Sequence, residues 1–139
     1  MQELAEFSGN NLLLVTGFLA SAFAVIFYEL RLKSQNIGSL NTMLAVRVIN
    51  DGCAVVDVRS ADLFSGGHLV DARNVPADEL TAEDLGKNKN GTLLVCETGG
   101  TSSATAAKLR AAGLENIYSL KGGIAAWQQE NLPIVSKGA

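Results

Sequence analysis

The sequence predicts an α/β domain built on a parallel sheet, preceded by a single apolar helix. Three short apolar runs, at 53–58, 93–95 and 117–120, are typical of strands that are buried on both faces. Helical stretches lie between these runs, and strands that alternate with helices form parallel sheets covered on both sides. A separate uncharged segment, from Ser8 to Tyr28, gathers the apolar excess of the chain. A length of 139 residues predicts one such domain and not two.

Composition excludes several classes of protein. The net charge is −3, and charged residues make up only 18% of the chain, whereas a nucleic-acid-binding protein needs a clustered basic face. Two cysteines and one histidine are too few for a disulfide scaffold, a four-cysteine zinc site or a His-rich metal centre. We therefore expect no nucleic acid as partner, no metal and no cofactor.

The uncharged N-terminal segment is long enough to cross a bilayer. As a helix, residues 8–28 would measure about 31 Å, which matches the hydrocarbon core. A buried helix of a soluble protein is disfavoured, because a small domain has little room for a helix that is apolar all round. A cleaved signal peptide begins with positive charge, but this segment follows Glu3 and Glu6. An uncleaved anchor is the favoured interpretation. Because Arg31 and Lys33 follow it, we expect the N-terminus outside and the domain in the cytoplasm.

The remainder of the chain is expected to divide at a short linker. We assign the anchor to residues 1–33, the linker to 34–39, the domain to 40–135 and a tail to 136–139. In the domain, Asn41 or Thr42 can cap a helix that runs to about Asn50, with Leu44, Val48 and Ile49 on one face. Further helical stretches are expected at 61–64, 81–85, 102–112 and 124–130.

One loop between a strand and a helix carries a cysteine. Ligands of parallel sheets bind at the carboxyl ends of the strands, and there the run ending at Val95 continues as Cys96-Glu97-Thr98-Gly99-Gly100-Thr101, with a helix from about Ser102. The glycines let successive N–H groups turn inward, and the helix N-terminus adds free N–H groups, so the loop favours an anion and a thiolate. Cys96 is therefore a candidate nucleophile. The alternative is a buried small hydrophobe, which is the interpretation we give to Cys53.

Five segments of the domain resemble those of the rhodanese (sulfurtransferase) family, in the family's order and spacing. They are Val55–Arg59; Phe64, Gly67 and His68 followed by Ala72, Asn74 and Pro76; Leu93–Cys96 with Gly99 and Ser102; Gly113; and Leu120–Ile124 with Trp127, Leu132 and Pro133. The resemblance covers about residues 40–135. It implies a rhodanese-like fold, with a parallel five-stranded sheet flanked by helices. An anchor ahead of one such domain also resembles a group of small bacterial inner-membrane proteins.

The resemblance also implies a chemistry. Cys96 would take a sulfane sulfur from thiosulfate or a persulfide and hand it to a thiol or another thiophilic acceptor. The substrate-binding residues would be Arg59 and the loop residues Glu97, Thr98, Gly99, Gly100, Thr101 and Ser102. The lipid bilayer is the second partner, and another inner-membrane protein is a third candidate. For Asp57 and His68 the expected role is to organise loops, and for Trp127 it is core packing.

The loop departs from the common family pattern at two positions. Many active members carry a basic residue where this chain has Glu97, and Arg where it has Thr101. A carboxylate beside the sulfur would repel an anionic donor, which favours a neutral or protein-bound persulfide. The same departures favour an alternative function, a weakly active or inactive rhodanese-fold module that docks proteins at a membrane. Phosphatase chemistry on this fold requires a loop one residue longer that contains an Arg, and the six residues from Cys96 to Thr101 include none.

Overall fold

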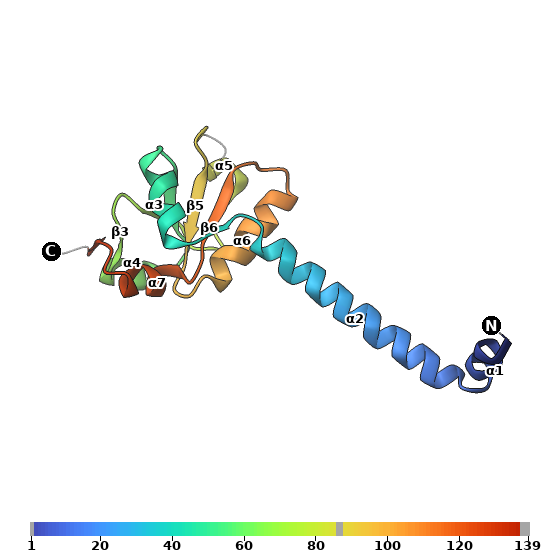
Figure 1. The fold of residues 1–139 in the computed structure, drawn as a ribbon. Helices are drawn as coiled ribbons and strands as arrows, with labels where there is room; N and C mark the ends of the chain where they lie inside the picture. The colour runs from blue at the N-terminus through green and yellow to red at the C-terminus, as the bar shows by residue number, and fades with distance from the viewer. Residues whose placement is uncertain (1, 86–87, 137–139) are drawn as a thin grey trace. The chain divides into compact units, whose positions relative to one another are not determined.

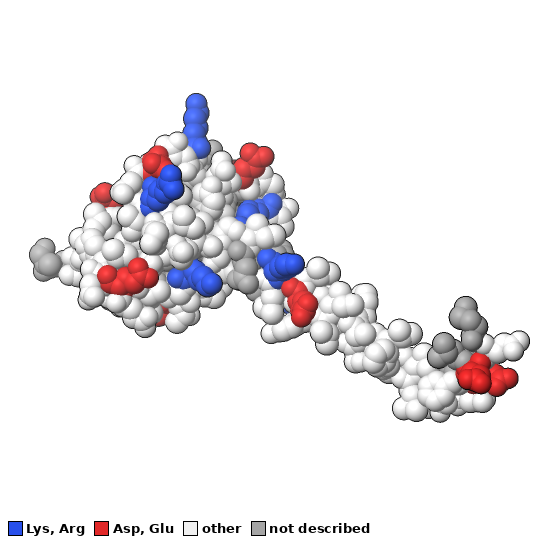
Figure 2. Space-filling view, viewed as in Figure 1, with Lys and Arg blue, Asp and Glu red and all other residues white. Residues whose placement is uncertain are grey.

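The computed structural model describes residues 2–85 and 88–136, and its contacts divide the chain into two units, one up to Ser34 and one from Gln35 onward. The N-terminal unit is helical, with α1 spanning Gln2–Asn10 and α2 spanning Leu12–Asn36. One helix, over Leu12–Lys33, is long and apolar enough to cross a membrane. Its mean hydropathy is 2.0, and none of this apolar stretch is buried against the rest of the protein. Figure 2 shows this stretch without charge between the acids near its start and the charges near its end.

The candidate span begins four residues later than the uncharged segment of the sequence. A break near Asn11 separates α1 from α2, so residues 8–10 belong to the first, more polar helix. The 25 residues of α2 give a helix about 37 Å long. Its length is sufficient for a bilayer core.

The second unit contains a five-stranded parallel sheet in the order β1-β6-β5-β2-β4 (Figure 1). The strands of this sheet are β1 (Ser39–Leu40), β2 (Ala54–Asp57), β4 (Arg73–Asn74), β5 (Thr92–Val95) and β6 (Ile117–Leu120). A separate antiparallel pair joins β3 (His68–Leu69) to β7 (Ile134–Val135). The predicted fold class is confirmed.

Helices cover both faces of the sheet. They are α3 (Thr42–Asn50), α4 (Ala61–Gly66), α5 (Ala82–Leu85), α6 (Gly100–Ala111) and α7 (Gly123–Gln129). Figure 1 shows α3 and α7 on one side of β5 and β6, and α5 and α6 on the other. Each helix predicted within the domain is found within two residues of its expected ends.

The core has two apolar layers because the strands alternate. Leu93 and Val95 of β5 point to the α3 and α7 side, where Trp127 packs. Leu94 and Cys96 point to the opposite side, against Leu109 of α6 and its neighbours. All three strand residues are completely buried. Cys96 therefore emerges from the central strand on the side that α6 covers.

At two positions the structure differs from what the sequence predicts. Leu44 was expected on the buried face of α3, but it is 45% exposed, and Ala45 lies in the core instead. The predicted linker contains the start of β1, because Ser39 pairs with β6. Two-residue strands such as β1 carry no periodicity that a sequence could reveal. Of the expected tail, only Ser136 falls within the described residues.

Candidate active site

Cys96 lies at the carboxyl end of the central strand, with its sulfur enclosed by the following loop. The residue is 4% exposed. The backbone N–H of Gly99 donates to Sγ over 3.0 Å and that of Ser102 over 3.3 Å. The hydroxyl Oγ of Ser102 also lies 3.3 Å from Sγ. These polar contacts distinguish Cys96 from an ordinary buried cysteine, because N–H donors stabilise a negatively charged sulfur.

The glycine at the start of α6 makes this curl possible. Gly99 is the N-cap residue and has a left-handed backbone, with φ of +93°, a conformation that only glycine adopts without cost. A Cβ on this residue would also press on the backbone of Gly122 and Leu120. Gly100 and Thr101 form the first turn of α6, where N–H groups have no intrahelical carbonyl to reach. The loop thus curls around the sulfur, with the N–H groups of Gly99 and Ser102 directed at it.

The start of α7 holds the outer side of the loop. The N–H of Ile124 donates to the carbonyl of Cys96 over 2.9 Å, and that of Ala125 donates to the carbonyl of Glu97 over 3.1 Å. Gly123, with φ of +61°, allows this approach, since a Cβ there would collide with both carbonyls. The two carbonyls are therefore directed toward α7. This N-terminal turn of α7 and its two carbonyl partners are called the α7 clasp below.

Glu97 is paired with a buried arginine. The guanidinium Nη1 of Arg59 lies 2.9 Å from Glu97 Oε2, while Nε and Nη2 hold the fully buried carboxylate of Asp57 at 2.8–3.1 Å. Burial alone would lower the pKa of Arg59, but its hydrogen bonds with Asp57 and Glu97 outweigh that effect and raise it. One cation therefore serves two carboxylates, and the group keeps a net negative charge.

Arg59 also ties the loop to neighbouring segments. Its Nη2 donates to the carbonyl of Gly67 over 2.6 Å. The next residue, His68, stacks on Phe64 with ring centroids 3.7 Å apart and hydrogen-bonds the Phe64 carbonyl through Nδ1. Asn74 donates to the backbone carbonyls of Asp57 and Arg59. Asp57 and His68 thus organise loops in this structure, as the sequence indicated.

The predicted site residues lie in one place but contribute differently. The backbone N–H groups of Gly99 and Ser102 donate to the sulfur, whereas the side chains of Thr98 and Thr101 are exposed. The four residues Glu97, Thr98, Gly100 and Thr101 supply backbone to the same loop. Arg59 lies beside the loop, with each guanidinium nitrogen already paired to Asp57, Glu97 or Gly67.

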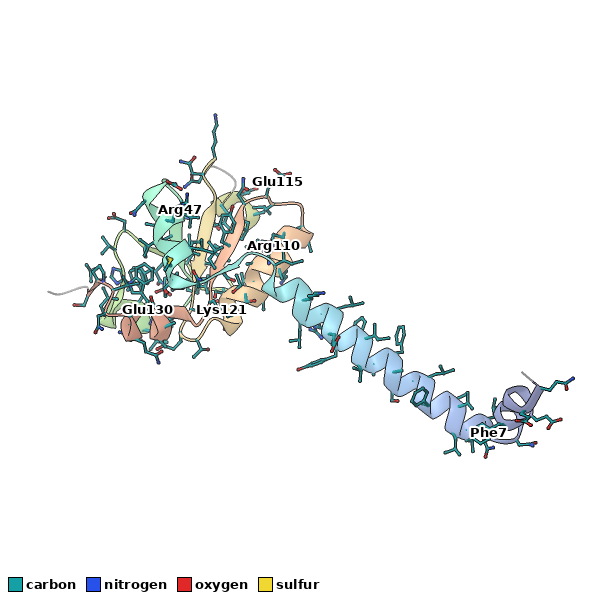
Figure 3. All side chains as sticks on the ribbon, in the orientation of Figure 1. Phe7, Arg47, Arg110, Glu115, Lys121 and Glu130 are labelled. Carbon is teal, nitrogen blue, oxygen red and sulfur yellow. The ribbon has the colours of Figure 1, made fainter. Side chains whose placement is uncertain are left out.

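Sequence reasoning missed one cation near the loop. Lys121 follows β6 and lines a pocket of about 260 Å³ together with Thr98, Gly99 and Ser39. Figure 3 labels it between β6 and α7. Its position directly after the strand next to β5 was a usable signal, because neighbouring parallel strands end at the same edge of the sheet.

The second cysteine has a different environment. Cys53 is buried in the core layer under α3, and burial raises the pKa of its thiol to about 11 despite a backbone hydrogen bond. Across the described ranges, no group of three or more Cys, His, Asp or Glu side chains is arranged to hold a metal ion. Cys96 is the thiol on which the polar contacts converge.

Several known proteins are similar to this chain in sequence or in structure. A family model described as a rhodanese-like domain matches residues 42–130. The uncharacterized protein YibN of Escherichia coli strain K12 is 31% identical over 140 residues, which cover 97% of this chain and 98% of that protein. The thiosulfate sulfurtransferase GlpE of Pseudomonas putida strain GB-1 is 33% identical over 90 residues, covering 64% and 82% of the two chains. A rhodanese-related protein from Thermoplasma volcanium superposes with a TM-score of 0.63 at 29% identity, covering 70% of this chain and 96% of that one.

Proposed function

Because the chain belongs to the rhodanese-like family, we propose that it is a membrane-anchored sulfurtransferase or sulfur carrier whose nucleophile is Cys96. The single observation that carries the proposal is the pair of N–H groups, from Gly99 and Ser102, that point at the Cys96 sulfur. The likeness to a relative named as a thiosulfate sulfurtransferase supports the same chemistry.

The reaction proceeds through a persulfide on Cys96. The thiolate attacks the outer sulfur of the donor, the donor S–S bond breaks, and its electron pair leaves with the remainder of the donor. With thiosulfate the leaving group is sulfite, and the product is Cys96–S–S⁻. A thiol acceptor then attacks the outer sulfur and restores the Cys96 thiolate. The backbone N–H groups of residues 99–102 would stabilise the negative charge on the outer sulfur until the acceptor removes it.

The charge around the loop favours a neutral or protein-bound donor. Glu97 adds a carboxylate next to the thiol, and this carboxylate forms an ion pair with Nη1 of Arg59. A dianion such as thiosulfate would meet an acid there and no free guanidinium. A persulfide carried by a protein presents less charge and suffers less repulsion.

The same charges favour a second candidate function, a rhodanese-fold module that docks partner proteins at the membrane. Under this hypothesis the Arg59–Glu97 ion pair stabilises the loop, and the Cys96 thiol reacts slowly. The retained cysteine and its N–H donors favour catalysis over this alternative.

For location, we propose a bacterial inner-membrane protein with one span, its N-terminus outside and its rhodanese domain in the cytoplasm. The apolar helix Leu12–Lys33 and the basic residues Arg31 and Lys33 support this. A reporter fused to the C-terminus should be active only in the cytoplasm. Activity outside the membrane, or release of a shortened soluble form, would contradict the assignment and favour a signal sequence.

Mass spectrometry of the full-length protein in detergent tests the chemistry. After incubation with thiosulfate or glutathione persulfide, we expect the mass of one added sulfur atom on the peptide that contains Cys96. Cys96→Ser should abolish this gain, while Cys53→Ser is the matched control and should retain it. Persistent sulfur transfer in Cys96→Ser would refute the assignment of the nucleophile. A complete lack of mass gain in the wild type would favour the docking module.

A further inference from the structure

The strand by which the chain enters the domain lies at the same end of the sheet as Cys96. Ser39 of β1 is in register with Ser119 of β6, and Ser119 is in register with Leu94 of β5, two residues before the cysteine. Two strand spacings and two residues along a strand separate Ser39 from Cys96, which is about 12 Å. The entry point and the reactive loop thus share one edge of the domain.

The pocket described above gives independent support for this proximity. Ser39 lines it together with Thr98, Gly99 and Gly100 of the loop and Lys121. The first residue of the entering strand and the loop around the sulfur therefore form one continuous concave surface of the domain.

The chain between the candidate span and this surface is short. The span ends at Lys33, six residues before Ser39, and six residues reach at most about 22 Å when fully extended. Adding the 12 Å within the domain, the backbone of Cys96 stays within about 34 Å of the end of the span. This ceiling follows from covalent length, so it holds for every orientation of the domain.

We propose that the sulfur donor of Cys96 is itself held at the membrane surface, as a persulfide on a membrane-bound protein. The proposal rests on the function proposed above and names its donor class. The short tether confines the thiol to a thin layer next to the bilayer, where a membrane-held donor has a high effective concentration. The pairing of Glu97 with Arg59 disfavours small free anions as donors. In the step, the Cys96 thiolate takes the outer sulfur of R–S–SH, the donor S–S bond breaks, and R–SH leaves with the electron pair and the proton.

A lipid-attached disulfide measures this reach directly. The full-length protein is placed in nanodiscs that contain a phosphatidylethanolamine with a 2-pyridyl disulfide on its headgroup, so that both faces of the disc carry the probe. Attack by the Cys96 thiolate forms a Cys96–lipid disulfide and releases pyridine-2-thione, which is followed by its absorbance. Soluble 2,2′-dipyridyl disulfide, at the same bulk concentration, is the reference, and Cys96→Ser is the blank.

We expect the lipid probe to react faster than the soluble probe by about 100-fold at about 10 µM, because a short tether gives effective concentrations in the millimolar range. A 30-residue (EAAAK)₆ spacer inserted after Ser34, about 45 Å long when helical, should remove this advantage. Its rate with the soluble probe should be unchanged, which shows that the loop is intact.

Two results would overturn the proposal. One is equal rates for the lipid and soluble probes in the wild type, and the other is a full advantage that survives the spacer. A chain that does not enter nanodiscs would also overturn it. Failure of the proposed function is seen separately, as the absence of a persulfide on Cys96 in the mass spectrometry experiment, since disulfide exchange with the probe requires only a thiolate within reach.

Discussion

Replacing Glu97 by glutamine should increase the use of thiosulfate. In the structure Glu97 Oε2 lies 2.9 Å from Arg59 Nη1, and the Glu97 side chain is 55% exposed. The substitution Glu97→Gln keeps the shape of the side chain, removes a negative charge next to the reacting sulfur, and loosens its hold on the guanidinium. Both changes favour an anionic donor.

The expected gain follows from Coulomb's law. A unit charge about 7 Å from a dianion repels it by about 2.4 kcal/mol at an effective dielectric constant of about 40. Screening at physiological salt, with a Debye length of about 8 Å, reduces this to about 1 kcal/mol. That corresponds to roughly fivefold in kcat/KM, and a partly freed Arg59 extends the gain to roughly tenfold. Because the Glu97 side chain is 55% exposed, loss of its ion pair should change the free energy of unfolding by less than about 1 kcal/mol.

The assay is steady-state thiosulfate:cyanide sulfurtransfer at low and high ionic strength. The gain should appear mainly in KM and should shrink at high salt, since salt screens the repulsion. Glu115→Gln is the matched control, because Glu115 is exposed and precedes β6, at the opposite end of the sheet from the loop. Thr101→Arg, which adds a cation to the loop, should act in the same direction. If neither Glu97→Gln nor Thr101→Arg exceeds the wild type, charge does not limit thiosulfate use and the docking module becomes the better account.

Three further predictions concern stability and the shape of the loop. Arg59→Met should lower the free energy of unfolding by about 3–5 kcal/mol, measured by urea denaturation, because it leaves the buried carboxylate of Asp57 unpaired; an unchanged midpoint would contradict the role of the pair. The thiol of Cys53 has its pKa raised from 9.0 to about 11, so it should resist alkylation at pH 7, as checked by peptide mapping. Because the folded state favours the neutral thiol, the contribution of Cys53 to the free energy of unfolding should be fully present below pH 9 and fall as the pH rises toward 11. Unfolding measured at several pH values checks this. Gly123→Ala should abolish sulfur transfer by pushing on the loop carbonyls. Gly113 also has a positive φ, of +98°, but nothing lies within 4 Å of a Cβ built there, so Gly113→Ala should cost only about 1 kcal/mol of stability and keep activity.

The sequence predicted the parts of the fold that depend on local pattern. The buried strands β2, β5 and β6 are short runs of mostly apolar residues. The helix after Asn41 has a capping side chain that accepts from the N–H of Leu44 in the structure. The edge strands β1 and β4 were not predicted, because two residues are too few to show the alternation of apolar and polar side chains that marks a strand.

The position of the cysteine loop could be predicted, but not all of its neighbours. A strand, a cysteine, two glycines and a helix are consecutive in the chain, so their geometry follows from local rules. The Arg59–Glu97 pair joins residues 38 positions apart, and the α7 clasp joins the loop after β5 to a segment that follows β6. Such contacts depend on the order of strands in the sheet, and here one of them pairs the acid of the loop with a cation.

The α7 clasp has a consequence for the dynamics of the site. The first N–H groups of a helix usually bond water or a capping side chain, but those of Ile124 and Ala125 bond the carbonyls of Cys96 and Glu97. Opening of α7 would therefore release the same peptide groups that direct Gly99 and Ser102 toward the sulfur. Loop and helix should then open as one cooperative unit, and the amides of Gly99, Ser102, Ile124 and Ala125 should exchange their hydrogens with a common free energy. The reactivity of the thiol would thus follow the opening equilibrium of a helix that does not itself touch the sulfur.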